Sequence, residues 1–308
     1  MKNNKLHIVF LFICAFFWGT TFVAQSIGAG YVGAYTYLAG RSVIAVVILT
    51  PVIKVLDQVA DKKGKDNKRP KNKAEQKYLI ISGLICGTFL CLASAAQQAG
   101  MAYTTAQKAS FLTASYVVLV PIFSILLKKK PPVQIAVCVL ISLIGMVLLC
   151  LGKSFLAGET LTIEKGDSLV ILCAVLFAIQ VLCIDNFVPH LDGVRLSRMQ
   201  FTVVAIESII FMLIFEHPTV ANVMMAMPAI LYAGVFSSGV AYTLQIVGQE
   251  DVNATLAALV MSLESVFGAL SGWLILGENL LPIEFTGAVL MFAAVILAQI
   301  PLPEKKKV

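Results

Sequence analysis

The chain has 308 residues, of which 59% are hydrophobic and only 13% are charged, with a formal net charge of +6. Its mean hydropathy of +0.89 is higher than a water-soluble domain of this length can bury, which excludes a soluble globular protein. Because backbone groups find no water inside a bilayer, the apolar segments are expected to be helices, and we predict an all-α integral membrane protein.

The apolar segments are numerous enough to cross a bilayer many times. A helix needs about 20 mostly apolar residues to span the hydrocarbon core. In chain order, such windows lie at about 7–26, 33–54, 78–98, 105–127, 133–152, 167–187, 197–215, 226–247, 253–275 and 282–300. We therefore predict ten transmembrane helices, mostly joined by short loops. The exception is the charged segment 55–77, in which residues 57–76 are predicted to form a solvated, flexible loop.

The basic residues lie mainly on one side of these predicted helices. If the N-terminus is cytoplasmic, nineteen of the 23 lysines and arginines fall on the cytoplasmic side, with large groups at 54–77, 128–130 and 305–307, and only Lys153 and Lys165 fall outside. Basic residues resist translocation. We predict a multi-pass protein of the cell (inner or plasma) membrane with both termini cytoplasmic. This pattern and some attraction to anionic membrane lipid account for the net charge without a nucleic-acid partner.

The two halves of the chain, 1–152 and 153–308, can be aligned with each other. The loop 55–77 belongs to the first half and a basic C-terminal tail to the second. Cys14-Ala15 aligns with Cys173-Ala174, Arg41 with Gln200, 106–123 with 250–267, and Pro132 with Pro282. Because each half contains five predicted helices, an odd number, the second half enters the bilayer from the opposite side. Such inverted repeats enclose a site near the midplane, and exchange of conformations between them gives alternating access.

Four ionisable residues lie within or beside the predicted helices: Arg41, Lys108, Glu207 and Glu264. Ionisable groups are costly in lipid and usually face a cavity or a partner. Glu264 is surrounded by apolar and small residues, so we hypothesise that it faces the central cavity and binds a substrate amine, titrates during coupling, or pairs with Arg41. The alternatives are a purely structural pair between Glu264 and Arg41, a Lys108 that snorkels to the interface, and an interhelical hydrogen bond for Glu207.

Uncharged polar and aromatic side chains within the helices suit the binding of an organic solute. These are Gln25, Gln97, Gln98, Gln180, Gln200, Gln245, Trp18, Tyr103, Tyr116 and Tyr242. Each aromatic taken singly also fits packing or a place at the membrane interface. No paired cysteine spacing or histidine cluster is present, so neither a metal nor another cofactor is expected.

Glycine and proline positions suggest close packing and a bend. Gly83 with Gly87 and Gly268 with Gly272 form GxxxG patterns, which allow close approach of helices within the bundle or between two copies. Pro121 removes a backbone hydrogen bond in the middle of the fourth predicted helix. We expect a kink there that shapes the cavity or serves as a hinge.

Four segments together resemble a known family. They are FFWGTTFVAQ (16–25), YLAGRSVIA (37–45), YTTAQKASFLTASYVVLVPIF (103–123) and SLESVFGALSGWLILGENLLPIEFTGAVLMFAAVIL (262–297). The chain is similar over residues 7–300 to the EamA family of the drug/metabolite transporter superfamily. This resemblance implies ten helices in two inverted EamA-like repeats of five, and export of amino acids or other small metabolites.

The resemblance also assigns positions. The family's Trp-Gly falls on Trp18-Gly19, its helix-two arginine on Arg41, and its helix-nine Glu-Pro on Glu264-Ser265. Serine here replaces the proline, which puts a kink of helix nine in doubt. Lys108, in the sequence TTAQKASF, matches many members of the family and so implies a role beyond snorkelling.

These observations predict a secondary transporter with no catalytic residues, a small-molecule metabolite as its partner, and possible proton coupling. The chain has no GxxxxGK[ST] sequence, so an ion gradient or the gradient of the solute itself would supply the energy. An intramembrane enzyme is the first alternative, although HExxH and other catalytic patterns are missing within the helices. A membrane receptor or scaffold is the second. The protein is expected to be a monomer or a homodimer.

Overall fold

The computed structural model describes residues 4–63, 68–129, 131–157, 165–277 and 281–300, and this part of the chain is helical without strands. In chain order the helices are α1 (Asn4–Ala29), α2 (Ala34–Lys62), α3 (Lys73–Met101), α4 (Ala106–Ala114), α5 (Tyr116–Leu126), α6 (Val133–Ala157), α7 (Lys165–Phe187), η1 (Val188–His190), α8 (Gly193–Phe215), α9 (Val220–Tyr232), η2 (Ala233–Ala241), α10 (Tyr242–Gly248), α11 (Ala254–Met261), α12 (Glu264–Leu276) and α13 (Pro282–Leu297). Lys2, Lys130, part of the predicted loop (64–67) and the basic tail (301–308) lie outside the described residues.

The described helices confirm the prediction of an all-α membrane protein. Nine of them, counting broken helices as one, are long and apolar enough to cross a bilayer. The tenth predicted span corresponds to α13, which has 16 residues and is therefore about 24 Å long, somewhat shorter than the hydrocarbon core. The predicted ten helices are thus nine long spans and one shorter helix.

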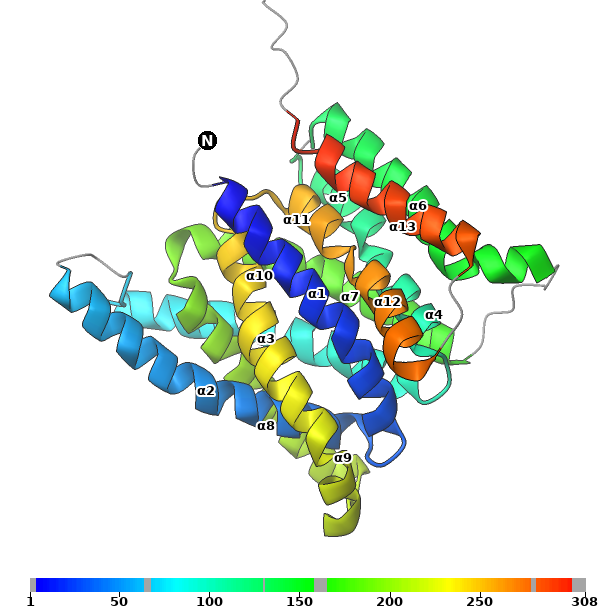
Figure 1. The fold of residues 1–308 in the computed structure, drawn as a ribbon. Helices are drawn as coiled ribbons and strands as arrows, with labels where there is room; N and C mark the ends of the chain where they lie inside the picture. The colour runs from blue at the N-terminus through cyan, green and yellow to red at the C-terminus, as the bar shows by residue number, and fades with distance from the viewer. Residues whose placement is uncertain (1–3, 64–67, 130, 158–164, 278–280, 301–308) are drawn as a thin grey trace, which may run out of the picture.

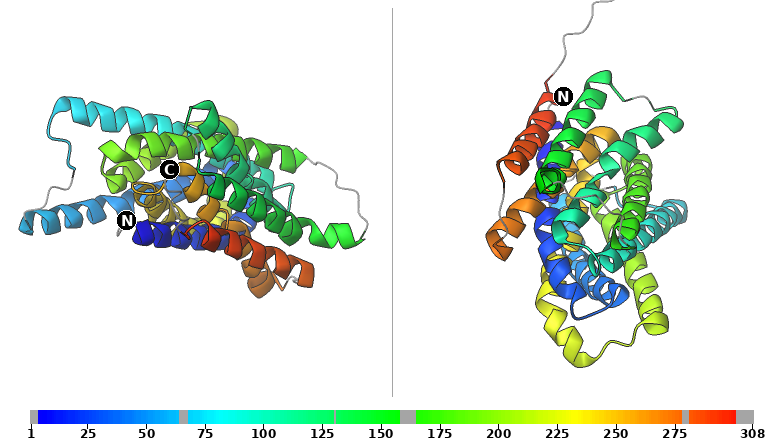
Figure 2. Two further views of the ribbon diagram at one scale, coloured as in Figure 1. Left: turned by 90° about the horizontal axis from the view of Figure 1, so that it is seen from above. Right: turned by 90° about the vertical axis from the view of Figure 1, so that its right-hand side faces the viewer.

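Successive spans alternate in direction, which defines two faces of the molecule. We call the face where α1 begins at Asn4 and α2 ends at Lys62 the N-terminal face, and the face where α1 ends at Ala29 the far face. In the left view of Figure 2, the joined ends of α2 and α3 extend at one end of the molecule and the end of α6 at the other. These two ends mark the N-terminal face and the far face, respectively.

Helix α1 packs with one face against elements of the second half, while Val9 and Phe16 on its other face are exposed. It contacts η2, α10, α11 and α12, and Figure 1 shows it between η2 and α10 on one side and α11 and α12 on the other. Gly19 makes the closest approach, because a Cβ there would lie 2.7 Å from the carbonyl oxygen of Glu264 and 2.7 Å from the backbone nitrogen of Gly268. The absence of a side chain at residue 19 therefore lets the backbones of α1 and α12 touch.

The first GxxxG pattern packs within the bundle. A Cβ at Gly83 would collide with Met199, and one at Gly87 would lie 2.8 Å from the carbonyl oxygen of Gln200, so both glycines face α8. In the second pattern, a Cβ at Gly268 would come within 3.3 Å of Ser110 on α4. At these positions the small residues serve helix contacts inside one chain.

Two spans are broken at equivalent points. The fourth span breaks at Ser115, between α4 and α5, and the ninth breaks at Ser262, between α11 and α12. In each break the serine hydroxyl donates to a carbonyl three residues earlier, at 2.6 Å for Ser115 and 2.8 Å for Ser262. Such bonds compete with the helical ladder and bend helices. The ninth span therefore breaks without the proline of the family pattern, and Pro121 lies inside α5, after the break.

The caps of these broken spans give the register of the two halves. Thr105 caps α4 and Asn253 caps α11, and each side chain accepts from the backbone N–H three residues later. These caps are 148 residues apart, whereas the alignment of 106–123 with 250–267 used a spacing of 144. A spacing of 148 also relates Tyr116 to Glu264, the first residues of α5 and α12.

The loop between α2 and α3 is shorter than predicted. Helix α2 continues to Lys62 and α3 begins at Lys73, so much of segment 55–77 is helical. Asn72 caps α3, accepting from the N–H of Glu75 at 2.9 Å while its amide donates back to the Glu75 carboxylate at 2.8 Å. This capping arrangement satisfies groups at the helix start, which explains why the polar sequence is helical.

Ion pairs tie the end of α2 and the loop after it to the second half of the chain at the N-terminal face. Asp57 pairs with Arg195 of α8 and, at 3.1 Å, with Arg69. Lys68 lies 3.4 Å from Glu250, which precedes α11. Burial raises the pKa of Glu250, and the positive charge of Lys68 opposes that rise. Because these side chains are partly exposed to solvent, each pair stabilises the contact only modestly.

Candidate functional site

A small cavity lies between the two halves of the bundle. Five of the predicted site residues line it, namely Trp18, Arg41, Tyr242, Gln245 and Glu264. Nine further residues complete the lining: Thr21, Phe22, Gln25, Gln97, Thr113, Tyr116, Phe177, Val181 and Ser237. The cavity measures about 20 Å³, which is room for roughly one water molecule. Charged, amide, hydroxyl and aromatic groups therefore meet here in a contracted space.

Arg41 enters the cavity from α2 and is held by hydroxyl groups. Its Nε donates to Ser238 at 2.7 Å and its Nη2 donates to Ser237 at 2.9 Å. Both serines lie on η2, a π-helical segment, whose wider turn differs from that of the α-helix and often marks functional sites. The guanidinium is 6.0 Å from the ring of Tyr242. Among the described residues no carboxylate lies within ion-pair distance of Arg41, so its buried charge has only neutral partners.

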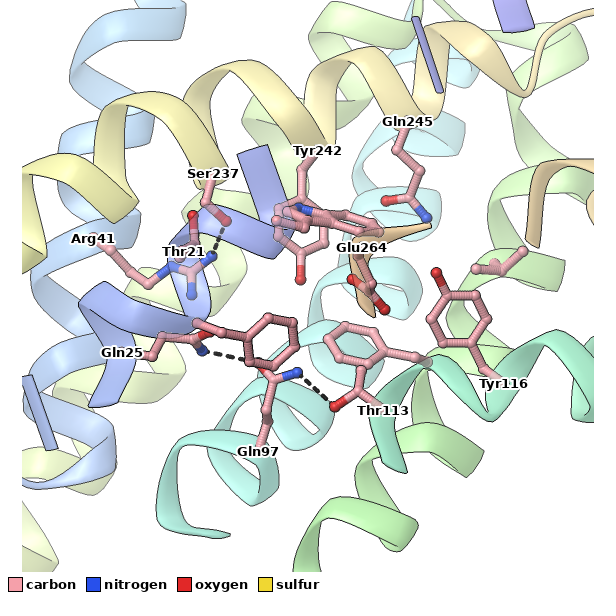
Figure 3. Close-up of a pocket in the computed structure, with 14 residues that line it drawn as sticks. Thr21, Gln25, Arg41, Gln97, Thr113, Tyr116, Ser237, Tyr242, Gln245 and Glu264 are labelled. Carbon is pink, nitrogen blue, oxygen red and sulfur yellow. Dashed lines mark hydrogen bonds between the residues drawn. The ribbon is translucent and has the colours of Figure 1, made fainter. Parts of the chain in front are cut away.

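Glu264 enters from the side of the cavity opposite to Arg41, as Figure 3 shows. It is the first residue of α12, immediately after the break in the ninth span, and its side chain lies near Tyr116 and Tyr242. Glu264 is 3% exposed, and its Oε1 has no hydrogen-bond partner. Within the described residues Glu264 has no basic ion-pair partner, so the structural pair between Arg41 and Glu264 is not formed.

Two further groups in the cavity wall have free hydrogen-bonding capacity. The indole Nε1 of Trp18 is buried without a partner, and the hydroxyl of Tyr116 has no partner other than the neighbouring Glu264 carboxylate. Trp18 packs against Tyr242 with ring centroids 4.6 Å apart, so its ring is fixed although its N–H is unused. Buried polar groups are normally satisfied, and those left open beside a cavity are available to a ligand.

A chain of amides closes the cavity toward the far face. Gln25 donates to Gln97 at 2.8 Å, and Gln97 donates to Thr113 at 3.0 Å, which joins α1, α3 and α4 (Figure 3). Gln98 donates to the carbonyl oxygen of Gln25 at 3.1 Å. We call these four residues the far-side amide chain.

The remaining predicted residues lie outside the cavity lining. Gln180 and Gln200 adjoin it through hydrogen bonds that connect them to Gln245. Glu207 accepts a hydrogen bond of 2.6 Å from Thr88, as expected for an interhelical contact between α3 and α8. Tyr103 is 53% exposed, two residues after the end of α3.

Lys108 lies near the far face, where it pairs with a buried acid. Its Nζ is 2.6 Å from Asp167 at the start of α7, and the side chain of Asp167 is only 2% exposed. This pair connects α4 to α7 at the far face. Lys108 therefore binds a protein carboxylate, and the structure does not bring it into the cavity.

We expect Lys108→Met to lower the free energy of unfolding by about 2 kcal/mol or more, because the change leaves the Asp167 carboxylate buried without this cation. Lys129→Met is the matched control, since Lys129 pairs at 2.7 Å with Asp185, a better exposed acid. Thermal unfolding in detergent measures both. Equal effects of the two changes would contradict the importance of burial at Asp167.

The sequence analysis had not singled out six lining residues. They are Thr21, Phe22, Thr113, Phe177, Val181 and Ser237. Thr21 and Phe22 follow Trp18 within one turn of α1, and Phe177 matches Trp18 in the alignment of the halves, so these three carried a usable signal. Ser237 had none, because its place depends on the π-helical segment.

The fold and the cavity together define the class: a multi-spanning helical membrane protein with a polar site between two halves. A sequence model described as the EamA-like transporter family matches residues 5–151 and 164–299. The chain belongs to this family, as the resemblance indicated, and is a membrane transporter.

Two relatives agree with this assignment, and a solved structure shares the fold. An uncharacterized transporter of Archaeoglobus fulgidus is 28% identical over 290 residues, covering 94% of this chain and 84% of the relative. An uncharacterized transporter of Methanothermobacter thermautotrophicus is 23% identical over 273 residues, covering 86% and 76%. A solved crystal structure of another protein has a TM-score of 0.74 at 16% identity and covers 96% of both chains, which shows that the fold is shared.

Proposed function

We propose that this transporter exports amino acids or other small organic metabolites by alternating access around the central cavity. The observation that carries the proposal is a pair of buried ionisable groups in one cavity, neither of which has a partner of opposite charge among the described residues. Arg41 has only hydroxyl and ring partners, and Glu264 has an open carboxylate oxygen on the opposite side.

The two charges suit a solute that carries both signs. A buried charge without a counter-ion is costly, and a zwitterion would supply a carboxylate to Arg41 and an ammonium group to Glu264. Charge-assisted hydrogen bonds of this kind are among the stronger polar contacts. The rings of Trp18, Phe177 and Tyr242 would pack on the apolar part of the solute.

The small volume of the cavity supports a cycle of opening and closing. A space of about 20 Å³ is too small for an organic solute, so binding requires the lining helices to separate. The breaks at Ser115 and Ser262 interrupt two spans beside Tyr116 and Glu264, the first residues of α5 and α12. Rocking of one half against the other around these residues would expose the cavity to each face in turn.

The orientation follows from the basic residues. The described lysines and arginines at the ends of α2, α3, α5 and α8 gather at the N-terminal face, which we assign to the cytoplasm of the cell membrane. Both termini are then cytoplasmic, and export moves the solute from the N-terminal face to the far face. Glu264 would take up a proton when no ammonium group is bound, which would couple transport to a proton gradient.

Counterflow in proteoliposomes tests the proposal directly. Vesicles containing purified protein are loaded with one unlabelled amino acid and exposed to the labelled compound, over a panel of amino acids, their decarboxylated amines and their deaminated acids. We expect saturable uptake stimulated by the internal solute for zwitterions, and weaker uptake for amines and acids. Protein-free vesicles are the control. Absence of stimulated uptake across the whole panel would overturn the proposal.

A further inference from the structure

Four glutamines form a second polar cluster between the central cavity and the N-terminal face. They are Gln180 of α7, Gln200 of α8, Gln245 of α10 and Gln249, the residue that caps α10. All are nearly fully buried, at 0%, 0%, 1% and 3% exposure, respectively. Gln245 also lines the cavity (Figure 3), so the cluster begins there and leads to the end of α10. We call these residues the glutamine cluster.

The hydrogen bonds inside the glutamine cluster are long and incomplete. Gln245 donates to Gln180 at 3.3 Å, and Gln180 donates to Gln200 at 3.4 Å. Gln249 donates to the carbonyl oxygen of Val181 at 3.0 Å. Three polar atoms are left buried without a partner: Oε1 of Gln245, Oε1 of Gln249 and Nε2 of Gln200. Each unmet group costs free energy in a dry interior, which favours a guest that can satisfy it.

The open atoms restrict the chemistry of that guest. The carbonyl oxygens of Gln245 and Gln249 require donors, and the Nε2 of Gln200 requires an acceptor. Water, a hydroxyl group or a carboxamide offers both. A carboxylate offers acceptors only, so it would leave both carbonyl oxygens unmet. The cluster carries no charge of its own, which also distinguishes it from the cavity with Arg41 and Glu264.

We propose that the glutamine cluster is a hydrated subsite, which binds water in the solute-free transporter and takes hydroxyl or carboxamide groups of the solute between the cavity and the N-terminal face. The binding of solute groups by the glutamine cluster rests on the proposed transport function, whereas the binding of water by the cluster does not. The subsite lies about two helical turns from the ends of α7 and α8, because Gln180 and Gln200 are each seven residues from those ends.

The far-side amide chain is better hydrogen-bonded than the glutamine cluster, and this difference determines from which face the cavity opens first. Its bonds from Gln25 to Gln97 and from Gln97 to Thr113 are 2.8 and 3.0 Å, shorter than the 3.3 and 3.4 Å bonds of the glutamine cluster. Among the four residues of the far-side amide chain, one buried polar atom, Oε1 of Gln98, has no partner, against three such atoms in the glutamine cluster. The helices joined by the far-side amide chain are therefore harder to separate than those joined by the glutamine cluster. Water therefore reaches the cavity from the N-terminal face.

Cysteine labelling of vesicles without solute tests this subsite. The variants Gln249→Cys and Gln245→Cys are treated from each face with a membrane-impermeant methanethiosulfonate, and the unchanged protein, with its seven native cysteines, gives the background. Gln97→Cys is the matched control from the far-side amide chain. We expect both cluster variants to react from the N-terminal face about tenfold faster than Gln97→Cys from either face.

Labelling of the cluster variants at the background rate, or only from the far face, would overturn the proposal. Should a variant fail to fold, radiolytic hydroxyl-radical labelling of the unchanged protein gives the answer. Phe201, which follows Gln200 in α8 and packs against Tyr242, should then be oxidised faster than Tyr37, although both side chains are buried; the Tyr37 hydroxyl is bonded at 3.2 Å to Ala229. Equal oxidation would overturn hydration. The labelling is done without solute. If the cluster variants are labelled as expected but counterflow fails, the transport proposal is rejected and the hydrated subsite is retained.

Discussion

Glu264→Gln is expected to reduce counterflow of zwitterionic solutes by about 100-fold, because it removes the negative charge that binds the ammonium group. The substitution keeps the size of the side chain, and Glu264 has no basic partner in the described chain, so the fold should persist. Initial rates in proteoliposomes, with the melting temperature and the size-exclusion profile of the same samples, measure this. The effect should fall mainly on solutes that carry an amine.

Glu207→Gln is the matched control for this prediction. Glu207 is also a glutamate within a span, but it lies outside the cavity and accepts a hydrogen bond from Thr88 at 2.6 Å. A glutamine can accept the same bond through its carbonyl oxygen. We therefore expect counterflow close to that of the unchanged protein. Undiminished counterflow by a folded Glu264→Gln variant would refute the proposed contact between Glu264 and the solute.

Gly19→Ala should lower the free energy of unfolding by about 3 kcal/mol, near the upper end for forced overpacking. The added Cβ would lie 2.7 Å from the Glu264 carbonyl oxygen and 2.7 Å from the Gly268 nitrogen. Both are backbone atoms of α12, so a side-chain rotation cannot relieve the contact. The helices must move apart, and because Glu264 begins α12, the cavity geometry changes with them. Thermal unfolding in detergent and counterflow of the surviving protein measure both effects.

Gly30→Ala serves as the control for this glycine. It lies just after the end of α1, and the nearest atom to an added Cβ is the carbonyl oxygen of Ile27 at 3.4 Å, an ordinary contact. Its effect on unfolding should be small. If Gly19→Ala and Gly30→Ala melt at the same temperature, close approach of α1 and α12 does not limit stability.

The site was only partly predictable, and the register of the two halves shows why. Aligning 106–123 with 250–267 placed the halves four residues from the register that the caps Thr105 and Asn253 define. Four residues are close to one helical turn, so either register puts the same kinds of residue on the same helix face. The match of Tyr116 with Glu264 therefore required the observed caps and breaks.

Single residues also differ in how much of their role the sequence predicted. Glu264 could be found from sequence because a carboxylate inside an apolar helix is unusual wherever it points. Lys108 drew attention for the same reason, yet it binds Asp167, 59 positions later in the chain, at 2.6 Å. The helical start of α3 was present in the sequence as Asn72 followed three residues later by Glu75, a capping pattern hidden among the charges of segment 55–77.

The sequence by itself determined the helical structure of this protein, its location in a membrane and its family. These depend on local hydrophobicity and on the order of short segments. Tertiary structure alone decided which polar groups meet. Arg41 reaches Ser237 and Ser238 almost 200 positions away, through a π-helical segment that hydrophobic periodicity does not reveal. Side-chain partners depend on how distant helices pack, and that packing also leaves the carboxylate of Glu264 and three atoms of the glutamine cluster unmatched.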